Sequence, residues 1–250
     1  MYSNNSRPMV ALGVLLAIGM SAAAFIFGAQ AKHIGSGRQS ISVKGLAEKP
    51  VKADYAEWHT GVRVHGQSFA EALGKMRRAR PALDQFLAKQ GFDKDALKEL
   101  SESVVPNMVE EELANGRTRQ VQRGFTASQE IVITTKDMAK IDAANKAVLQ
   151  FEADGNPVTH SPPLYLVSNL EEIKMSLIGA ATENAQKRAG EFAKYGDVKA
   201  GAIRSASQGA FYILPAGASV DSNEYGGAYD KSTVDKTARV VVTIEYNIDR

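Results

Sequence analysis

The clearest pattern of hydrophobic and polar positions in the chain runs from Ala56 to His65. The residues of one parity are Ala56, Trp58, Thr60, Val62 and Val64, and those of the other are Glu57, His59, Arg63 and His65. Successive side chains of a strand point to opposite faces, so this alternation predicts a half-buried strand with Trp58 turned inward. The longer stretch 41–65 predicts a first strand, a turn at 48–50 and this second strand.

The periodicity of the remaining chain predicts three helices and further strands. A capping box at Ser68 and Glu71 begins a helix that ends at Gly91, and Pro81 should kink or divide it. The dipeptide at 115–116 is Asn-Gly, which predicts a two-residue hairpin turn and places Glu112 opposite Arg119. The other predicted elements are a helix from 134 or 135 to about 153, a strand at 164–168, a helix from Asn169 to Gly196, and strands at 203–211 and 239–248.

These elements predict an α+β fold in which a mixed or antiparallel sheet packs with three helices. Their order is β-β-α-β-β-α-β-α-β-β, after one N-terminal transmembrane helix. Residues 9–31 carry no charge and would span about 34 Å as a helix, enough to cross a bilayer core. We therefore expect a cytoplasmic tail at 1–8, a transmembrane signal-anchor at 9–31, a tether at 32–40 and a periplasmic domain at 41–250.

An alternative for the N-terminal segment is a signal peptide that is cleaved after Ala31. The small residues Ala29 and Ala31 fit a cleavage site, but the apolar core is longer than signal peptides usually have. Basic residues flank the segment on both sides, so charge alone does not fix the topology. The expected location is the bacterial inner membrane with the C-terminal domain in the periplasm, or the periplasm itself if the segment is cleaved.

Composition narrows the function classes. The chain has 30 basic and 28 acidic residues and no cysteine. A net charge near zero disfavours nucleic-acid binding, and without cysteine there is no disulfide, thiol nucleophile or cysteine zinc site. His59 and His65 would lie about 20 Å apart on one strand, too far to share a metal ion. We predict no catalytic residue, no metal and no cofactor.

Two features favour contact with a protein partner. The long connection 215–233 is rich in glycine, serine, tyrosine and acids, and connections of this length often bind something. The last helix carries a stripe of small residues that would let another helix or sheet approach closely, and Asn184 within it needs a hydrogen-bond partner. The predicted oligomer or partner interface consists of Tyr212, Tyr225, Tyr229, Ala181, Ala185 and Ala189.

The residues ISVKGLAEKPVKADYAEWHTGV at 41–62 resemble the opening of the SIMPL-domain family, also called the YggE-like family. Further matches, in the family's order, are the FAEAL at 69–73, GFTAS at 124–128, DMAK at 137–140 and NAxxxA at 184–189. The resemblance implies an α+β domain, a periplasmic or surface location in bacteria, homo-oligomeric rings in some members and a loose association with oxidative or envelope stress. It implies no catalytic residues.

Three functional hypotheses follow. The first is a membrane-anchored, non-enzymatic periplasmic domain that self-assembles as a scaffold and is linked to envelope or oxidative stress. The second is a receptor that binds a ligand or peptide through the long loop and exposed strand edges. The third is a hydrolase, which would require a pocket that gathers Glu57, His59 or His160 with a second carboxylate.

Overall fold

The computed structural model describes residues 6–36, 39–112, 116–218 and 227–249, with the side chains of 12–26, 28 and all described residues from 39 onward. The chain divides into two compact units. The first unit comprises 1–47, 175–210 and 240–250, and the second comprises 48–174 and 211–239. Residues 41–250, predicted as one domain, thus contribute to both units.

The described chain is α+β, as predicted, with antiparallel pairing throughout the registers of the larger sheet. It has four α-helices: α1 contains the segment predicted as an N-terminal transmembrane helix, and α2, α3 and α4 are the three helices predicted to pack with a sheet. It has nine strands where seven were predicted, because β3 and β6 are added. The elements are α1 Ser6–Ser36, β1 Ser40–Lys52, β2 Tyr55–Gly66, α2 Phe69–Lys89, the 3-10 turn η1 Lys94–Ala96, β3 Leu97–Glu99, β4 Ser103–Glu112, β5 Thr118–Thr135, α3 Met138–Ala153, β6 Val158–His160, β7 Leu164–Leu166, α4 Leu170–Tyr195, β8 Lys199–Pro215 and β9 Asp235–Asp249.

The prediction of a transmembrane helix at 9–31 is corrected by the structure. Within the described part of the chain, no helix is long and apolar enough to cross a membrane.

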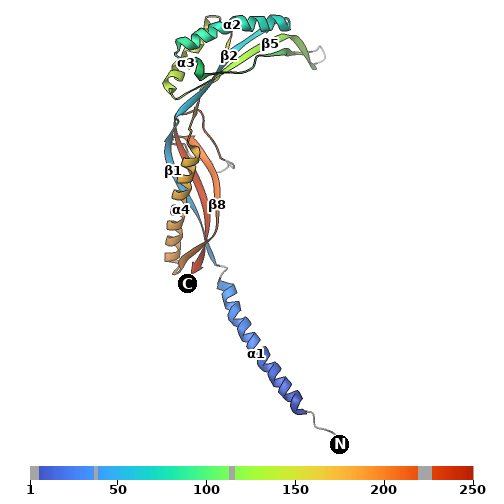
Figure 1. The fold of residues 1–250 in the computed structure, drawn as a ribbon, viewed down its shortest axis with the longest axis vertical. Coiled ribbons are helices and arrows are strands. Elements are labelled where there is room, and N and C mark those ends of the chain that lie inside the picture. Colours follow the sequence, from blue (N-terminus) through green and yellow to red (C-terminus); the bar gives the residue numbers. More distant parts are fainter. Residues whose placement is uncertain (1–5, 37–38, 113–115, 219–226, 250) are drawn as a thin grey trace. The chain divides into compact units, whose positions relative to one another are not determined.

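The second unit is built on a sheet in the order β3-β5-β2-β6, with β4 also paired to β5 and β7 to β2. Helices α2 and α3 cover one face of this sheet (Figure 1). Trp58 is fully buried on that face, as the alternation predicted, and its indole nitrogen donates to the carbonyl of Ser161 at 2.9 Å. The buried core includes Ala56, Trp58, Val62, Met76, Leu83, Leu87, Ile131, Ile133, Ile141 and Val148.

Helix α2 begins as predicted, with the side chain of Ser68 accepting the amide of Glu71 at 3.2 Å. The expected division at Pro81 is wrong, because α2 continues as one helix through this residue. Buried Met76 and Leu83 pack against the sheet on both sides of Pro81. Tertiary packing therefore compensates for the missing backbone donor of the proline.

The predicted pairing of Glu112 with Arg119 is wrong by one residue. Glu112 lies opposite Thr118, and Glu111 lies opposite Arg119 with 3.0 Å between Oε2 and Nη2. The connection between the paired residues is 113–117, which is longer than the two-residue turn assumed for the prediction. Asn115 of the predicted turn lies outside the described residues.

A bulge also interrupts the alternation of β5. The register with β4 shifts between Pro106 and Met108, opposite Gly124, whose φ is 78°. A Cβ on Gly124 would lie 2.3 Å from the backbone oxygen of Gly66, so only glycine fits here. The parity of β5 therefore changes at the bulge, and Val121, on the far side of it, is half-buried.

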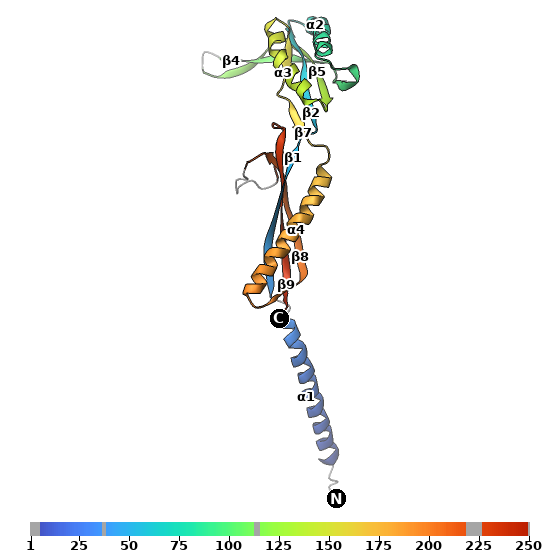
Figure 2. The ribbon, with the colours of Figure 1, turned by 90° about the vertical axis from the view of Figure 1, so that its left-hand side faces the viewer.

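In the first unit, the sheet has the order β1-β9-β8, and α4 lies alongside these strands (Figure 2). The small-residue stripe of α4 is fully buried at Ala181, Ala185 and Ala189. A Cβ at Gly45 of β1 would lie 1.9 Å from the backbone oxygen of Ala181. The predicted close approach is confirmed, but the sheet that approaches belongs to the same chain.

Candidate functional site

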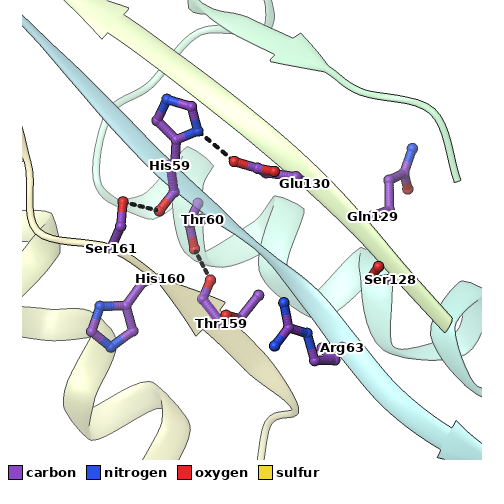
Figure 3. Close-up of a pocket in the computed structure, with 9 residues that line it drawn as sticks. All are labelled: His59, Thr60, Arg63, Ser128, Gln129, Glu130, Thr159, His160 and Ser161. Atoms are coloured by element: carbon purple, nitrogen blue, oxygen red, sulfur yellow. Dashed lines mark hydrogen bonds and ion pairs between the residues drawn. The ribbon is translucent and has the colours of Figure 1, made fainter. Parts of the chain in front are cut away.

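The second unit contains a polar pocket of about 170 Å³ between β2, β5 and β6 (Figure 3). Its lining residues are His59, Thr60, Arg63, Ser128, Gln129, Glu130, Thr159, His160 and Ser161. No hydrophobic residue is among them. The pocket is therefore suited to a small polar ligand rather than to an apolar one.

Strand register explains why these side chains meet. Arg63 lies opposite Ser128, and Gly61 lies opposite Glu130 on one side and Thr159 on the other. Since Val62 faces the helices, the neighbouring positions 61 and 63 face the other side of the sheet. Arg63, Ser128, Glu130 and Thr159 thus form a cross-strand cluster on the face that α2 and α3 leave uncovered.

Gly61 permits the close spacing of β2 and β5 beside this pocket. A Cβ at this position would lie 2.4 Å from the backbone oxygen of Gln129 and 3.0 Å from the Cα of Glu130. A larger residue would push β5 away from β2. The glycine therefore helps to hold Glu130 close to the neighbouring His59 and Arg63 of β2.

His59 is held between two carboxylates. Its Nε2 lies 2.9 Å from Oε1 of Glu57, and its Nδ1 bonds to Oε1 of Glu130. Both ring nitrogens can donate only when the imidazole is protonated. The hydrogen bonds with Glu57 and then with Glu130 raise the pKa of His59, so the geometry and the electrostatics both favour an imidazolium.

Arg63 differs from other arginines of the chain. Arg77 and Arg119 form ion pairs with glutamates at 2.6 Å and 3.0 Å. The Arg63 guanidinium has no ion pair or hydrogen bond to any residue that the structure describes. The pocket therefore contains an exposed cation whose donors are available to a ligand.

The pocket meets the condition set for the hydrolase hypothesis only in part. His59 lies with two carboxylates, but these occupy both of its nitrogens, which leaves none to accept a proton. Ser161 donates to the His59 backbone carbonyl at 3.5 Å, and the Thr60 hydroxyl donates to the Thr159 carbonyl at 3.2 Å. Among the described residues, no hydroxyl of the pocket is paired with an imidazole, and none is arranged as an activated nucleophile.

His160 does not complete such a constellation. Its ring points away from that of His59 (Figure 3), and its Nε2 lies 3.7 Å from Oε2 of Glu152. His65, the other histidine of β2, bonds to the Thr126 hydroxyl at 2.9 Å. No cluster of three or more potential metal ligands occurs among the residues with described positions.

The predicted interface residues are dispersed. Ala181, Ala185 and Ala189 are covered by the chain's own sheet, so they are not available as an outer surface. Tyr212 is half-buried in β8, and Tyr225 lies outside the described residues. The half-buried Tyr229 accepts a hydrogen bond from the amide of Val167 at 2.8 Å, and burial is the main reason that its pKa is raised.

A buried ion pair fixes residues 227–233, the described C-terminal end of the connection 215–233. Lys236 Nζ lies 2.9 Å from Oδ2 of Asp230, and neither side chain is more than 9% exposed. Burial opposes ionisation of Asp230, but hydrogen bonds from Ser232, Thr233 and Lys236 outweigh it and hold the pKa of this carboxyl well below its usual range. This end of the predicted interface is therefore part of the folded second unit.

A second surface of functional interest is the pair of edges of the β1-β9-β8 sheet. Along β1, Asn184 of α4 accepts the Leu46 amide at 3.1 Å, and Arg188 donates to the Lys44 carbonyl at 3.0 Å. The hydrogen-bond partner predicted for Asn184 is thus the edge of β1. Along β8, residues 202–209 are all exposed, and no described strand pairs with the other side of 199–210.

Sequence reasoning missed the pocket because its residues come from three strands, one of which was not predicted. Strand β6 has three residues and follows Pro157, so it gives no periodic signal. The alternation placed Arg63 and His59 on the face away from Trp58, which is correct. It did not indicate that the two side chains line one pocket. The available signal was Gly61 in the middle of an otherwise regular strand, because such a glycine often marks a close backbone approach.

The family model of SIMPL, described as a protein of unknown function (DUF541), matches residues 41–246. The chain belongs to the SIMPL family. A comparison with curated proteins gives no match. The family assignment agrees with the resemblance of residues 41–62 and defines a fold class whose activity is not known.

Proposed function

We propose that this SIMPL-family chain is a non-enzymatic scaffold that self-assembles by pairing the free edge of β8 with a second copy. The observation that supports this proposal is the exposure of 202–209 on an edge strand. Unpaired backbone donors and acceptors on such an edge form hydrogen bonds readily with another strand. The proposed product is a homo-oligomer in which a sheet continues from one copy into the next.

The composition of β8 supports a functional edge. Monomeric proteins usually protect an edge strand with charges, proline, a bulge or short length. Strand β8 has 17 residues, and its positions 205–214 carry neither a charge nor a proline. The outer edge is bonded at Ile213, whose amide donates to the Ala228 carbonyl at 2.8 Å and whose carbonyl accepts from the Asp230 amide at 2.7 Å.

The opposite edge of the same sheet restricts the geometry of assembly. Asn184 and Arg188 already bond to backbone groups of β1, so β1 offers a second copy fewer free partners than β8 does. Pairing of β8 with β8 is self-complementary and closes as a two-fold dimer. Pairing of β8 with β1 would instead continue into a ring or filament.

The proposed place of action is the periplasm of a bacterium, with a link to envelope or oxidative stress. The support for this part of the proposal is the family resemblance and the uncharged segment at 9–31 that precedes the domain. Export of the domain and its location can be measured by fractionating cells that express the full chain.

Light scattering of the purified full chain, with and without Ile203→Lys, tests the assembly. Ile203 is 53% exposed on β8, and a lysine there places like charges close together across a β8–β8 contact. We expect the dissociation constant of the dimer to rise at least about tenfold. Met175→Lys, at a position 66% exposed on α4, is the matched control and should leave the dimer unchanged.

Two outcomes would contradict the proposal. One is a strictly monomeric wild-type chain at all concentrations that light scattering can measure. The other is an equal loss of assembly in the Ile203→Lys and Met175→Lys variants, because that result would place the contact on α4 rather than on β8.

A further inference from the structure

We propose that the pocket between β2, β5 and β6 binds the carboxylate of a small polar ligand through Arg63. This function is separate from assembly, because the pocket lies wholly in the second unit and residues 199–210 of β8 lie in the first. The proposal rests on the unpaired guanidinium, the hydroxyls around it and the balance of charge in the pocket.

Arg63 supplies the directional part of the site. A guanidinium presents its donors as a planar fork that matches the two oxygens of a carboxylate. Ser128 lies directly opposite Arg63 in the register of β2 and β5, and Thr159 lines the same pocket from β6. These two hydroxyls can donate to a carboxylate oxygen, and they can also accept from other polar groups of a ligand.

The charges around the pocket favour a monoanion over a dianion. Glu57 and Glu130 contribute two negative charges, and Arg63 and protonated His59 contribute two positive charges, so the cluster is neutral overall. Within the cluster, both carboxylates bond to His59, which leaves the hydrogen-bond donors of Arg63 available to the ligand. A phosphate dianion would be repelled by Glu130 more strongly than a carboxylate would.

The size of the pocket restricts the ligand further. A volume of about 170 Å³ is smaller than the roughly 300 to 1,000 Å³ of pockets that hold drug-sized molecules. The ligand, or the part of it that enters, therefore has few heavy atoms. A free small acid and the C-terminal carboxylate of a peptide share this chemistry.

The test is NMR titration of the full wild-type chain near neutral pH, monitoring the Arg63 Nε–Hε and Gly61 amide signals. The probes are acetate, the dipeptide alanyl-alanine, the C-terminal amide of that dipeptide, and inorganic phosphate. We expect acetate or alanyl-alanine to shift both signals to saturation, and the amide to leave them unchanged. Saturation by the dipeptide at concentrations at which acetate has no effect would identify peptide termini as the source of the carboxylate.

Variants separate recognition by Arg63 from general attraction of anions. Arg63→Gln should weaken binding of the carboxylate probe at least about tenfold, as judged from the Gly61 amide. Arg63→Lys should keep part of the affinity, because the charge remains and the fork is lost. Arg78→Gln is the matched control, since Arg78 is exposed on α2 and does not line the pocket.

Three results would overturn the carboxylate site: no probe shifts the signals, phosphate binds more tightly than the carboxylate probes, or Arg63→Gln binds as the wild type does. Arg63 is exposed, so we expect the Arg63→Gln variant to fold, and its NMR spectrum checks this before the titration.

The titration is repeated with Ile203→Lys. Binding that persists in this variant shows that the pocket acts independently of β8, whatever the outcome for assembly.

Discussion

The two edge strands of the β1-β9-β8 sheet differ in how far the rest of the chain covers their free backbone groups. The edge of β1 is covered by α4, which bonds to its backbone through Asn184 and Arg188. The edge of β8 has no such cover along 199–210 among the described residues, and its side chains from 202 to 209 are exposed. The same sheet therefore has one edge protected within the chain and one edge available to a partner.

In the proposed assembly, this difference lets one helix determine which strand edge is open to a second copy. Small residues on α4 bring it against β1, and two polar residues four positions apart on α4 then reach the strand's free backbone groups. Protection of one edge limits edge-to-edge pairing to the other. In the proposed assembly, α4 thereby restricts the number of copies that can join.

The largest expected effect comes from separating α4 from β1 with Gly45→Ala. The new Cβ would lie 1.9 Å from the Ala181 carbonyl oxygen, so the helix or the strand has to move. We expect a loss of about 3 kcal/mol in the free energy of unfolding, measured with urea. The control is Gly179→Ala on α4, where the new Cβ meets nothing within 4 Å.

In the control, the higher helix propensity of alanine should leave stability equal or slightly increased. If the two substitutions have the same effect, the contact between α4 and β1 is looser than the structure indicates.

A smaller effect is expected when α4 stays in place but no longer bonds to the edge. The double variant Asn184→Ala and Arg188→Ala removes the partners of the Leu46 amide and the Lys44 carbonyl. We expect a loss of about 2 kcal/mol in the free energy of unfolding, because both groups are left to water or remain unsatisfied. Light scattering should also detect species larger than the dimer, since β1 then offers a second open edge.

Lys187→Ala is the control for this double variant, because Lys187 forms an ion pair with Glu183 on the exposed side of α4 and does not bond to β1 among the described residues. It should change neither stability nor particle size. Assembly that stays unchanged in the double variant would argue that α4 does not limit the number of copies.

The smallest effect concerns Glu245, which lies on the central strand between the two edges. Its carboxylate accepts from Ser40 of β1 at 2.5 Å and from Ser205 of β8 at 3.1 Å. These hydrogen bonds, the one from Ser40 first, lower the pKa of Glu245. Because the folded-state pKa is lower than the unfolded one, the stabilisation is present above the unfolded pKa of about 4.5 and is lost as the pH falls through the folded value.

The measurement is the free energy of unfolding as a function of pH for the wild type and Glu245→Gln. We expect the wild type to lose its advantage over the variant as the pH falls below about 4.5, while the difference at neutral pH stays constant. Parallel curves across the acidic range would mean that the pKa of Glu245 does not change on folding.

The sequence predicted features that depend on local chemistry. The alternation around Trp58 placed β2 and its buried face, and the Ser68 cap placed the start of α2. The sequence did not predict features that depend on contact with backbone groups far away along the chain. The bulge at Gly124 requires the carbonyl of Gly66, and β6 exists only because it pairs with β2. Such pairings leave no periodic trace in the strand concerned.

The same distinction applies to the functional surfaces. The sequence identified Asn184 as a residue that needs a partner, but the partner is 138 positions away in the chain. It grouped tyrosines near a long connection, whereas the available edge lies in a segment of small residues before that connection. Arg63 was visible as a polar residue, but its lack of a partner became evident only from the positions of the surrounding acids.

The buried position of Trp58 gives the protein a built-in optical reporter. It is the chain's one tryptophan, it lies in the core of the second unit, and its indole bonds to Ser161 at the rim of the pocket. Tryptophan emission therefore follows unfolding of the second unit alone, whereas circular dichroism follows the backbone of both. Recording the two signals on one sample separates the melting of the unit that holds the pocket from that of the unit that holds both strand edges.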